Sequence, residues 1–126
     1  MNKILWTLQG LLAAVFLAHG LLLLFPPPDI LTLMNETMSS GFRVFLGVAE
    51  VLAAIGLTLP GITRVLPWLI PCAAGGLMIV MIAATVFHMR RSEVSSAMTT
   101  AILLVLATYV AYMRWKVHPI VPRTPS

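Results

Sequence analysis

Four long apolar runs dominate the pattern of hydrophobic and polar positions along this chain. Each run holds roughly 18 to 23 residues, and a helix needs about 20 apolar residues to cross the hydrocarbon core of a bilayer. The loops between the runs are short, and no remaining segment is long enough to fold around a core of its own. The pattern therefore predicts an all-α integral membrane protein, a single-domain four-helix bundle with an up-down-up-down path. The predicted helices cover about residues 4–25, 43–60, 66–88 and 96–115.

The connection between the first two runs has a different pattern. Three prolines, Pro26–Pro28, end the first helix, because proline lacks an amide hydrogen and disfavours helical backbone in the residue before it. Apolar residues then recur at helical spacing at Ile30, Leu31, Met34 and Met38, with polar residues opposite them. This pattern predicts a short amphipathic helix lying flat at the membrane interface. A lid over a cavity in the bundle is the alternative interpretation.

Composition and charge support a membrane protein. Of the 126 residues, 60% are hydrophobic and 10% are charged, and the net charge of +4 comes from basic residues at helix ends, which does not indicate nucleic-acid binding. The positive-inside bias then predicts that both termini are cytoplasmic. Residues 118–126 have little to bury, so we expect a flexible tail. The basic residues on the side of the termini are Lys3, Arg64, Arg114, Lys116 and Arg123, against Arg43, Arg90 and Arg91 on the other side.

Glu50 lies near the middle of the second run and is the main candidate for chemistry. Arg43 lies seven residues before it, on nearly the same helix face, with Gly47 between them and Ala54 continuing the stripe. A polar stripe on an apolar helix faces the interior of a bundle, because charges in contact with lipid are costly. We therefore expect Arg43 and Glu50 to be coupled directly or through one bridging group. A salt-bridge network that only fixes the register of the helices is the alternative.

Other polar residues of the spans lie at depths that suggest a pocket in the outer half of the bundle. His19 and Glu50 are both predicted to lie about 9 to 10 Å below the outer rim, where His88 ends the third run. We expect Glu50 and His19 to be the two catalytic residues, with Glu50 exchanging protons and His19 acting as its partner. A structural hydrogen bond of His19 to a backbone carbonyl, and an interfacial role for His88, are the alternatives. The residues predicted to bind a ligand are Arg43, His88, Thr85 and Gln9.

Several short motifs resemble the DoxX-like family of small bacterial four-helix membrane proteins. They are the run from Glu50 to Pro60, Pro67 and Pro71 with Gly76-Leu77, the run from Phe87 to Glu93, and the run from Tyr109 to Arg114. The similarity covers roughly residues 4 to 116, although family members usually carry Gly where Arg91 or Ser92 stands and Asn near Met98. The resemblance implies a four-helix fold in the inner membrane. Named relatives include a thiosulfate:quinone oxidoreductase subunit, a partner in a thiol-stress complex, assembly factors and cargo receptors.

The absence of several sequence motifs limits the reactions that we expect of this chain. Cys72 is the single cysteine, so the chain has no intramolecular disulfide and no Cys-x-x-Cys pair, and any thiol chemistry belongs to a partner. His19 and His88 are predicted to lie at different depths, and the acidic residues other than Glu50 lie in loops, where we expect them not to orient a metal-bound histidine; we therefore expect neither haem nor metal. We therefore predict a subunit of quinone-linked or thiol-related oxidoreduction whose pocket accepts a small hydrophobic ligand, with quinone as the candidate cofactor. A non-catalytic scaffold or assembly factor is the alternative. Expected partners are the lipid bilayer, a membrane or peripheral protein, and a second copy of the chain.

Overall fold

The computed structural model describes residues 2–123, and this part of the chain contains helices and no strands. Four helical segments are long and apolar enough to cross a membrane, as the runs of the sequence predict. The protein is an all-α, multi-pass integral membrane protein. The helices are α1 (Asn2–Leu24), α2 (Pro28–Thr37), α3 (Ser40–Thr63), α4 (Leu69–Arg90) and α5 (Val94–Tyr112), which continues into the π-helical turn η1 (Met113–Val117).

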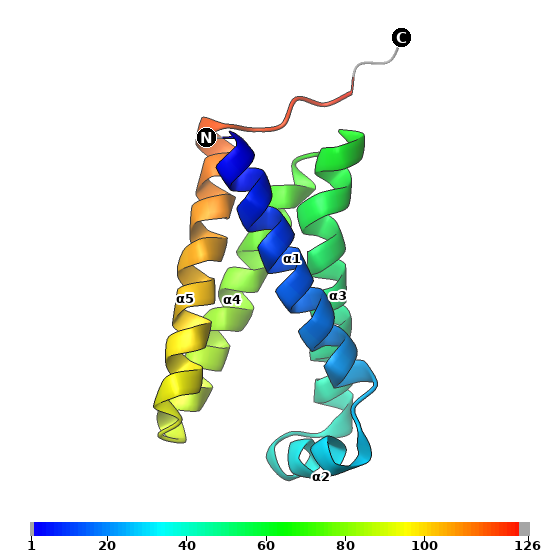
Figure 1. Cartoon of the computed structure of the whole chain (residues 1–126), viewed down its shortest axis with the longest axis vertical. Helices are drawn as coiled ribbons and strands as arrows, with labels where there is room; N and C mark the ends of the chain where they lie inside the picture. The colour runs from blue at the N-terminus through cyan, green and yellow to red at the C-terminus, as the bar shows by residue number, and fades with distance from the viewer. Residues whose placement is uncertain (1, 124–126) are drawn as a thin grey trace.

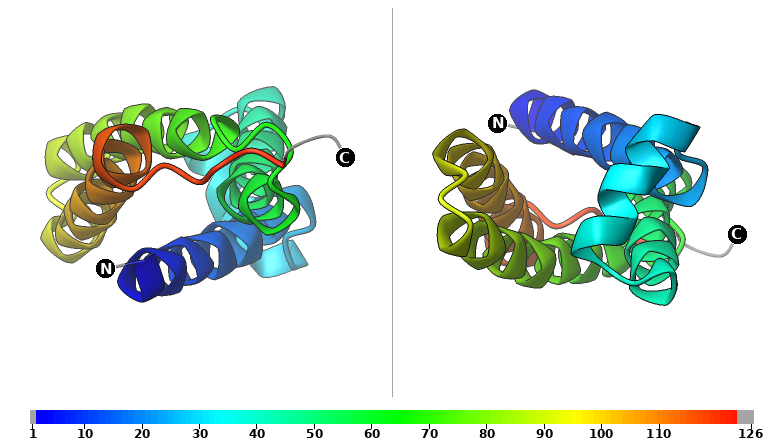
Figure 2. Two further views of the ribbon diagram at one scale, coloured as in Figure 1. Left: turned by 90° about the horizontal axis from the view of Figure 1, so that it is seen from above. Right: turned by 90° about the horizontal axis from the view of Figure 1, so that it is seen from below.

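The four long helices run up and down in turn, as Figures 1 and 2 show. Helix α1 packs on α3, α3 packs on α4, and α4 packs on α5, so neighbours in this series are also neighbours in space. The end of the bundle that holds Asn2 and the C-terminal segment is here named the terminal end. The opposite end, with α2 and the Arg91–Glu93 turn, is named the hairpin end. The two helix pairs, α1 with α3 and α4 with α5, splay apart toward the hairpin end (Figure 1).

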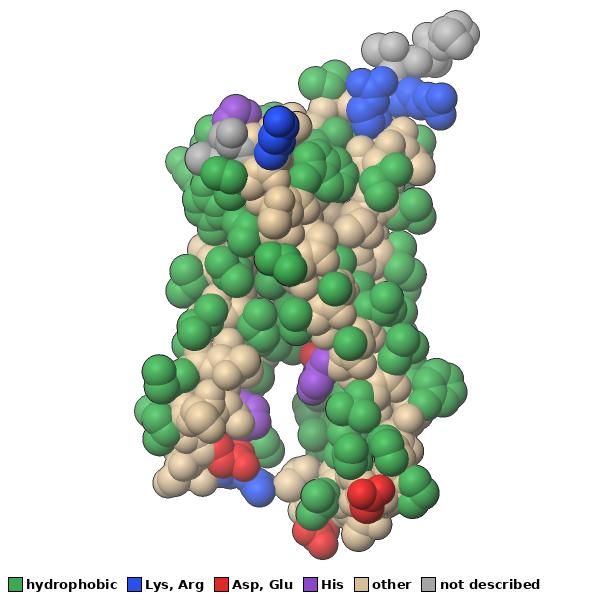
Figure 3. Space-filling model, in the orientation of Figure 1, with side chains coloured by type: hydrophobic (Ala, Val, Ile, Leu, Met, Phe, Trp, Pro, Cys, Tyr) green, Lys and Arg blue, Asp and Glu red, His purple; other side chains and the backbone are tan. Residues whose placement is uncertain are grey.

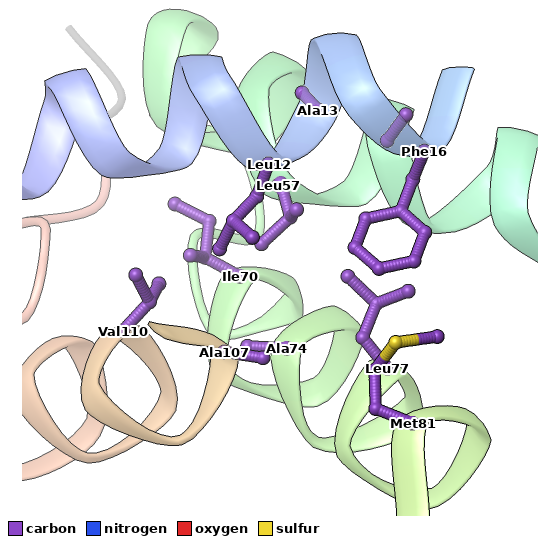
Figure 4. Packing of buried hydrophobic residues seen from close by; sticks show 11 residues of the cluster. Leu12, Ala13, Phe16, Leu57, Ile70, Ala74, Leu77, Met81, Ala107 and Val110 are labelled. Carbon is purple, nitrogen blue, oxygen red and sulfur yellow. The ribbon is translucent and has the colours of Figure 1, made fainter. Parts of the chain in front are cut away.

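The buried core lies in the middle and terminal half of the bundle, where the helices converge. Figure 4 shows its side chains meeting between α1, α3, α4 and α5. Phe16 and Leu57 are almost completely buried, because every long helix contributes a stripe of apolar residues to this region. The cluster consists of Leu12, Ala13, Phe16, Ala54, Leu57, Ile70, Ala74, Leu77, Met81, Ala107 and Val110.

Helix α3 is longer at both ends than the 43–60 run predicts. It begins after Ser39, whose side-chain oxygen accepts a hydrogen bond of 3.2 Å from the amide of Phe42. It continues through Pro60 to Thr63, three residues beyond the predicted end at residue 60. A proline removes one backbone hydrogen bond, which membrane helices tolerate when their neighbours pack closely. Helix α4 begins later than residue 66, because Leu66 has a φ of 51° and cannot lie in a right-handed helix.

The expected amphipathic helix is α2, which has no buried residue and lies across the hairpin end beside α1 and α3 (Figures 1 and 2). At the terminal end, residues 118–123 cross from α5 toward α3 (Figure 2). The amide of Arg123 donates a 2.7 Å hydrogen bond to the carbonyl of Arg64. Ile120 packs on the core cluster. The expected flexibility of the tail stays a prediction, and its residues 124–126 lie outside the described chain.

Candidate functional site

Glu50 and His19 meet where α1 and α3 cross closely. Gly20 and Gly47 form the crossing: a β-carbon on Gly20 would lie 3.0 Å from the carbonyl oxygen of Gly47, and one on Gly47 would lie 3.0 Å from that of Gly20. Small residues let two membrane helices approach in this way. The Nδ1 atom of His19 consequently lies 2.8 Å from Oε2 of Glu50, at hydrogen-bond distance. The predicted pairing of these two residues is present.

The two members of this pair differ in their surroundings. The side chain of Glu50 is 4% exposed, whereas that of His19 is 54% exposed. Figure 3 shows an open cleft between the two helix pairs at the hairpin end, with histidine side chains on both of its walls. His19 is on α1, one of the helices that border this cleft. A buried carboxylate thus reaches an accessible imidazole through one hydrogen bond, and imidazole is the side chain best suited to take up and release protons near neutral pH.

Arg43 and Glu50, both in the described chain, form no direct hydrogen bond or ion pair, and their expected coupling through one bridging group stays a prediction. Its Nη1 donates to the backbone carbonyl of Leu23, in the last turn of α1. The last carbonyls of a helix have no partner within the helix and attract positive charge. Arg43 therefore caps α1 from α3 and lies two helical turns from Glu50. Its Nε atom is buried and has no partner among the described residues.

Thr85 and His88 lie on α4, on the other side of the cleft from the Glu50–His19 pair. The hydroxyl of Thr85 is 2.8 Å from that of Thr100 on α5. The Nδ1 atom of His88 is 2.9 Å from Oε1 of Glu93. This hydrogen bond, helped by the charge of Arg91, lowers the pKa of the Glu93 carboxyl below its ordinary value. Both predicted ligand residues are therefore engaged in joining α4 to α5.

Gln9 belongs to a separate polar cluster near the terminal end. Its Nε2 donates a 2.7 Å hydrogen bond to the carbonyl of Leu57, and its Oε1 accepts a 2.6 Å bond from Nε of Arg114. Gln9 and Arg114 are both buried. The sequence placed Arg114 in a basic belt at the membrane surface and so missed this contact. A buried glutamine in an apolar helix needs hydrogen-bond partners, and that requirement is the signal that could have indicated it.

An apolar groove with a volume of about 790 Å³ lies between α3 and α4. It extends from Glu50 toward the turn after α3, rather than lying wholly in the outer half as expected. Of the six predicted site residues only Glu50 lines it, and Glu50 is the sole charged group among its described lining residues. These are Ala49, Glu50, Leu52, Ala53, Ile55, Gly56, Leu59, Pro60, Thr63, Val65, Leu66, Leu69, Cys72, Ala73, Gly76, Leu77 and Val80.

The arrangement can hold and transfer a proton. Glu50 lies between the apolar groove on one side and the half-exposed imidazole of His19 on the other. A proton can therefore pass between the two side chains without crossing the apolar core. Within residues 2–123, no group of three or more His, Cys, Asp or Glu side chains lies close enough to hold a metal ion.

Comparison with known proteins agrees with the fold and the motifs. The model of the DoxX-like family matches residues 7–110, which include all four membrane-spanning segments in whole or in large part. No curated protein and no solved structure shows a significant match to the chain. Because the family match covers most of the sequence, the chain belongs to the DoxX-like family.

Proposed function

We propose that this protein binds a small hydrophobic molecule in the α3–α4 groove and exchanges a proton with it through Glu50. The observation that supports this proposal is the position of Glu50, a buried carboxylate that lines an apolar groove and is bonded to a half-exposed histidine. Ligand pockets are mostly apolar, with a few polar groups that orient the ligand. The apolar part of the molecule would lie along α3 and α4, with its polar group at Glu50.

His19 would serve as the second proton carrier. A protonated Glu50 gives its proton to an oxygen of the bound molecule, and the His19 imidazolium returns one to the carboxylate across their 2.8 Å contact. Imidazole then recovers a proton from the cleft. The placement of the termini in the cytoplasm and of the protein in the inner membrane would put this cleft on the outer face.

A quinone fits this chemistry, because reduction of a quinone consumes protons together with electrons. The chain has a single cysteine, Cys72, and therefore no dithiol of its own to supply electrons. We propose accordingly that the protein is a subunit associated with quinone-linked or thiol-related oxidoreduction, whose electrons come from a partner. A non-catalytic scaffold is the second candidate, supported by the bond that Glu50 forms between α3 and α1.

Mass spectrometry of molecules that co-purify with the protein in mild detergent tests the proposal. Gly76 lines the groove and Gly75 does not, and an added β-carbon meets nothing within 4 Å at either position. Gly76→Leu therefore adds apolar volume at the groove from a β-carbon that meets no clash, and Gly75→Leu is its matched control. We expect a hydrophobic molecule to co-purify with the wild type and with Gly75→Leu, and to be lost from Gly76→Leu.

Glu50→Gln separates the two candidate functions. A proton-exchanging site should keep its bound molecule and lose turnover once the partner and substrate are supplied, whereas a scaffold should keep its partner with no change in turnover. Equal retention of the molecule by both leucine variants, or the recovery of bulk lipid alone, would refute binding in the groove.

A further inference from the structure

A second cavity, of about 350 Å³, lies at the terminal end and plays no part in the proposal above. It is lined by residues of the first turns of α1, of the ends of α3 and α5, and of the C-terminal segment. Figure 2 shows how this segment crosses from α5 toward α3. Its described lining is basic, aromatic and apolar and includes no acidic residue. These residues are Asn2, Trp6, Gly61, Arg64, Arg114, His118, Pro119, Ile120 and Val121.

Arg114 is the unusual member of this cavity, because the residue is charged and yet almost wholly buried, at 3% exposure. Its Nε donates to Gln9 and its Nη1 donates a 3.0 Å hydrogen bond to the carbonyl of His118. Its Nη2 atom is buried and has no hydrogen-bond partner among the described residues. A buried donor on a charged group is costly to leave unpaired, so an acceptor is expected at this position.

No Asp or Glu side chain among the described residues pairs with Arg114. The chain has four acidic residues, and all of them lie within residues 2–123. Asp29 and Glu36 are on α2 at the hairpin end, Glu50 pairs with His19, and Glu93 pairs with His88. The buried charge of Arg114 and the nearby charge of Arg64 therefore face a cavity that contains no counter-ion from the described chain.

We propose that this cavity binds a phosphate-type oxyanion between Arg114 and Arg64. Guanidinium groups present paired donors that match the oxygens of phosphate, and desolvation strengthens the bond. The cavity lies where the spans end, which is the level of phospholipid headgroups, and basic pockets between membrane helices hold such headgroups. The headgroup phosphate of an anionic phospholipid and a free phosphate ion share this chemistry.

An oxyanion at this position would also tie together elements that are distant in the sequence. Arg64 follows the last turn of α3, and Arg114 lies in η1 at the end of α5. The segment between His118 and Arg123 already bridges them, through the His118 carbonyl and the Arg123 amide. The ligand would add a charged link between the same helix ends. Binding should therefore raise the thermal stability of the whole bundle.

The test uses the full chain in a mild neutral detergent with two kinds of probe. Phosphatidylglycerol is compared with phosphatidylcholine by native mass spectrometry and thermal unfolding, and inorganic phosphate is compared with chloride at equal ionic strength. Arg114→Gln removes the buried charge, and Arg64→Asn removes the second one while keeping a residue that tolerates the φ of 56° at that position. Lys116→Gln is the matched control, since Lys116 is basic, lies at the same end and does not line the cavity.

We expect the wild type and Lys116→Gln to bind one phosphate-bearing probe per chain and to gain thermal stability from it. Arg64→Asn should weaken this binding by about tenfold or more, as the loss of a charge-assisted contact predicts. A response to phosphatidylglycerol alone identifies the lipid as the source, and a response to inorganic phosphate identifies the free ion. If neither probe stabilises the wild type, or if Lys116→Gln loses the response as Arg64→Asn does, the proposal is wrong. Should Arg114→Gln fail to fold, the comparison of Arg64→Asn with Lys116→Gln still decides.

Discussion

Replacement of Gly20 by alanine should destabilise the bundle, because this glycine lies in the close crossing of α1 and α3. A β-carbon there would lie 2.9 Å from Cγ2 of Val51, 3.0 Å from the carbonyl oxygen of Gly47 and 3.2 Å from Cβ of Glu50. Carbon atoms in good contact are about 3.5 to 4.0 Å apart. The two helices would therefore have to separate by roughly half an ångström at this point.

The neighbours of the added β-carbon cannot easily move to relieve the clash. Val51 is β-branched and holds one strongly preferred rotamer in a helix, and the second contact is to backbone. Overpacking of this kind typically costs about 1 to 3 kcal/mol. The same separation would stretch the His19–Glu50 contact from 2.8 Å to about 3.3 Å, beyond the usual range for a hydrogen bond. Gly20→Ala should therefore lose proton exchange as well as stability.

Gly10→Ala is the matched control, because Gly10 lies on the same helix and an added β-carbon there meets nothing within 4 Å. Both substitutions gain the same helix propensity, up to about 1 kcal/mol, so their difference isolates the packing penalty. The free energy of unfolding of each variant can be measured by titration with denaturing detergent in mixed micelles. If Gly20→Ala proves as stable as Gly10→Ala, the close crossing does not carry the energy assigned to it here.

Three further predictions concern the membrane topology, the pH dependence of the His88–Glu93 bond and the interhelical bond of Thr85. With the native cysteine removed, Glu36→Cys should react with a membrane-impermeant thiol reagent added outside cells and Arg64→Cys should not; the reverse pattern would invert the proposed topology. The lowered pKa of Glu93 means that its bond with His88 stabilises the protein above the ordinary carboxyl pKa and that this contribution is lost as the pH falls through the lowered value. The thermal stability of Glu93→Gln should thus approach that of the wild type in acid and fall below it at pH 7, and a constant difference would refute this. Thr85→Val should lower the unfolding free energy by about 0.5 to 1.5 kcal/mol through loss of its interhelical bond, and no change would show that the bond contributes nothing.

Features that depend on periodicity and length could be read from the sequence. The lengths of the apolar runs predicted the four membrane helices. The helical spacing of Ile30, Leu31 and Met34, with polar residues opposite them, predicted α2. Helix ends were less predictable, because they depend on single backbone conformations. Ser92 adopts a φ of 59°, a backbone conformation that glycine reaches most easily, and nothing in the sequence alone indicates that this serine would adopt it. Pro60 lies within α3, because membrane helices tolerate the loss of the hydrogen bond that a proline removes.

The candidate site was predictable only where depth decides contact. His19 and Glu50 were placed at the same depth by counting residues from the helix ends, and they form a hydrogen bond. The depth of a residue in the membrane does not show which helices are neighbours or how each helix is rotated. Thr85 and His88 were predicted to join Glu50 in one pocket because of their depth, whereas in the structure they bond Thr100 and Glu93. Arg43 shared a face with Glu50, but an unbonded carbonyl at the end of α1 was a nearer acceptor. Which of two possible acceptors a side chain bonds can be read only from a three-dimensional structure.

The two polar sites are separated by a layer that has almost no hydrogen-bonding side chain. On α1, the residues between Gln9 and His19 are all apolar or glycine, and this stretch is about 15 Å long. On α3, the same holds between Glu50 and Leu57, whose carbonyl accepts from Gln9. Phe16, Leu57 and Leu77, which belong to α1, α3 and α4, are buried in the apolar core between the two sites. In the proposed function, protons would therefore reach Glu50 from the hairpin side through His19, and we expect a local exchange at one membrane face instead of proton transport across the bilayer.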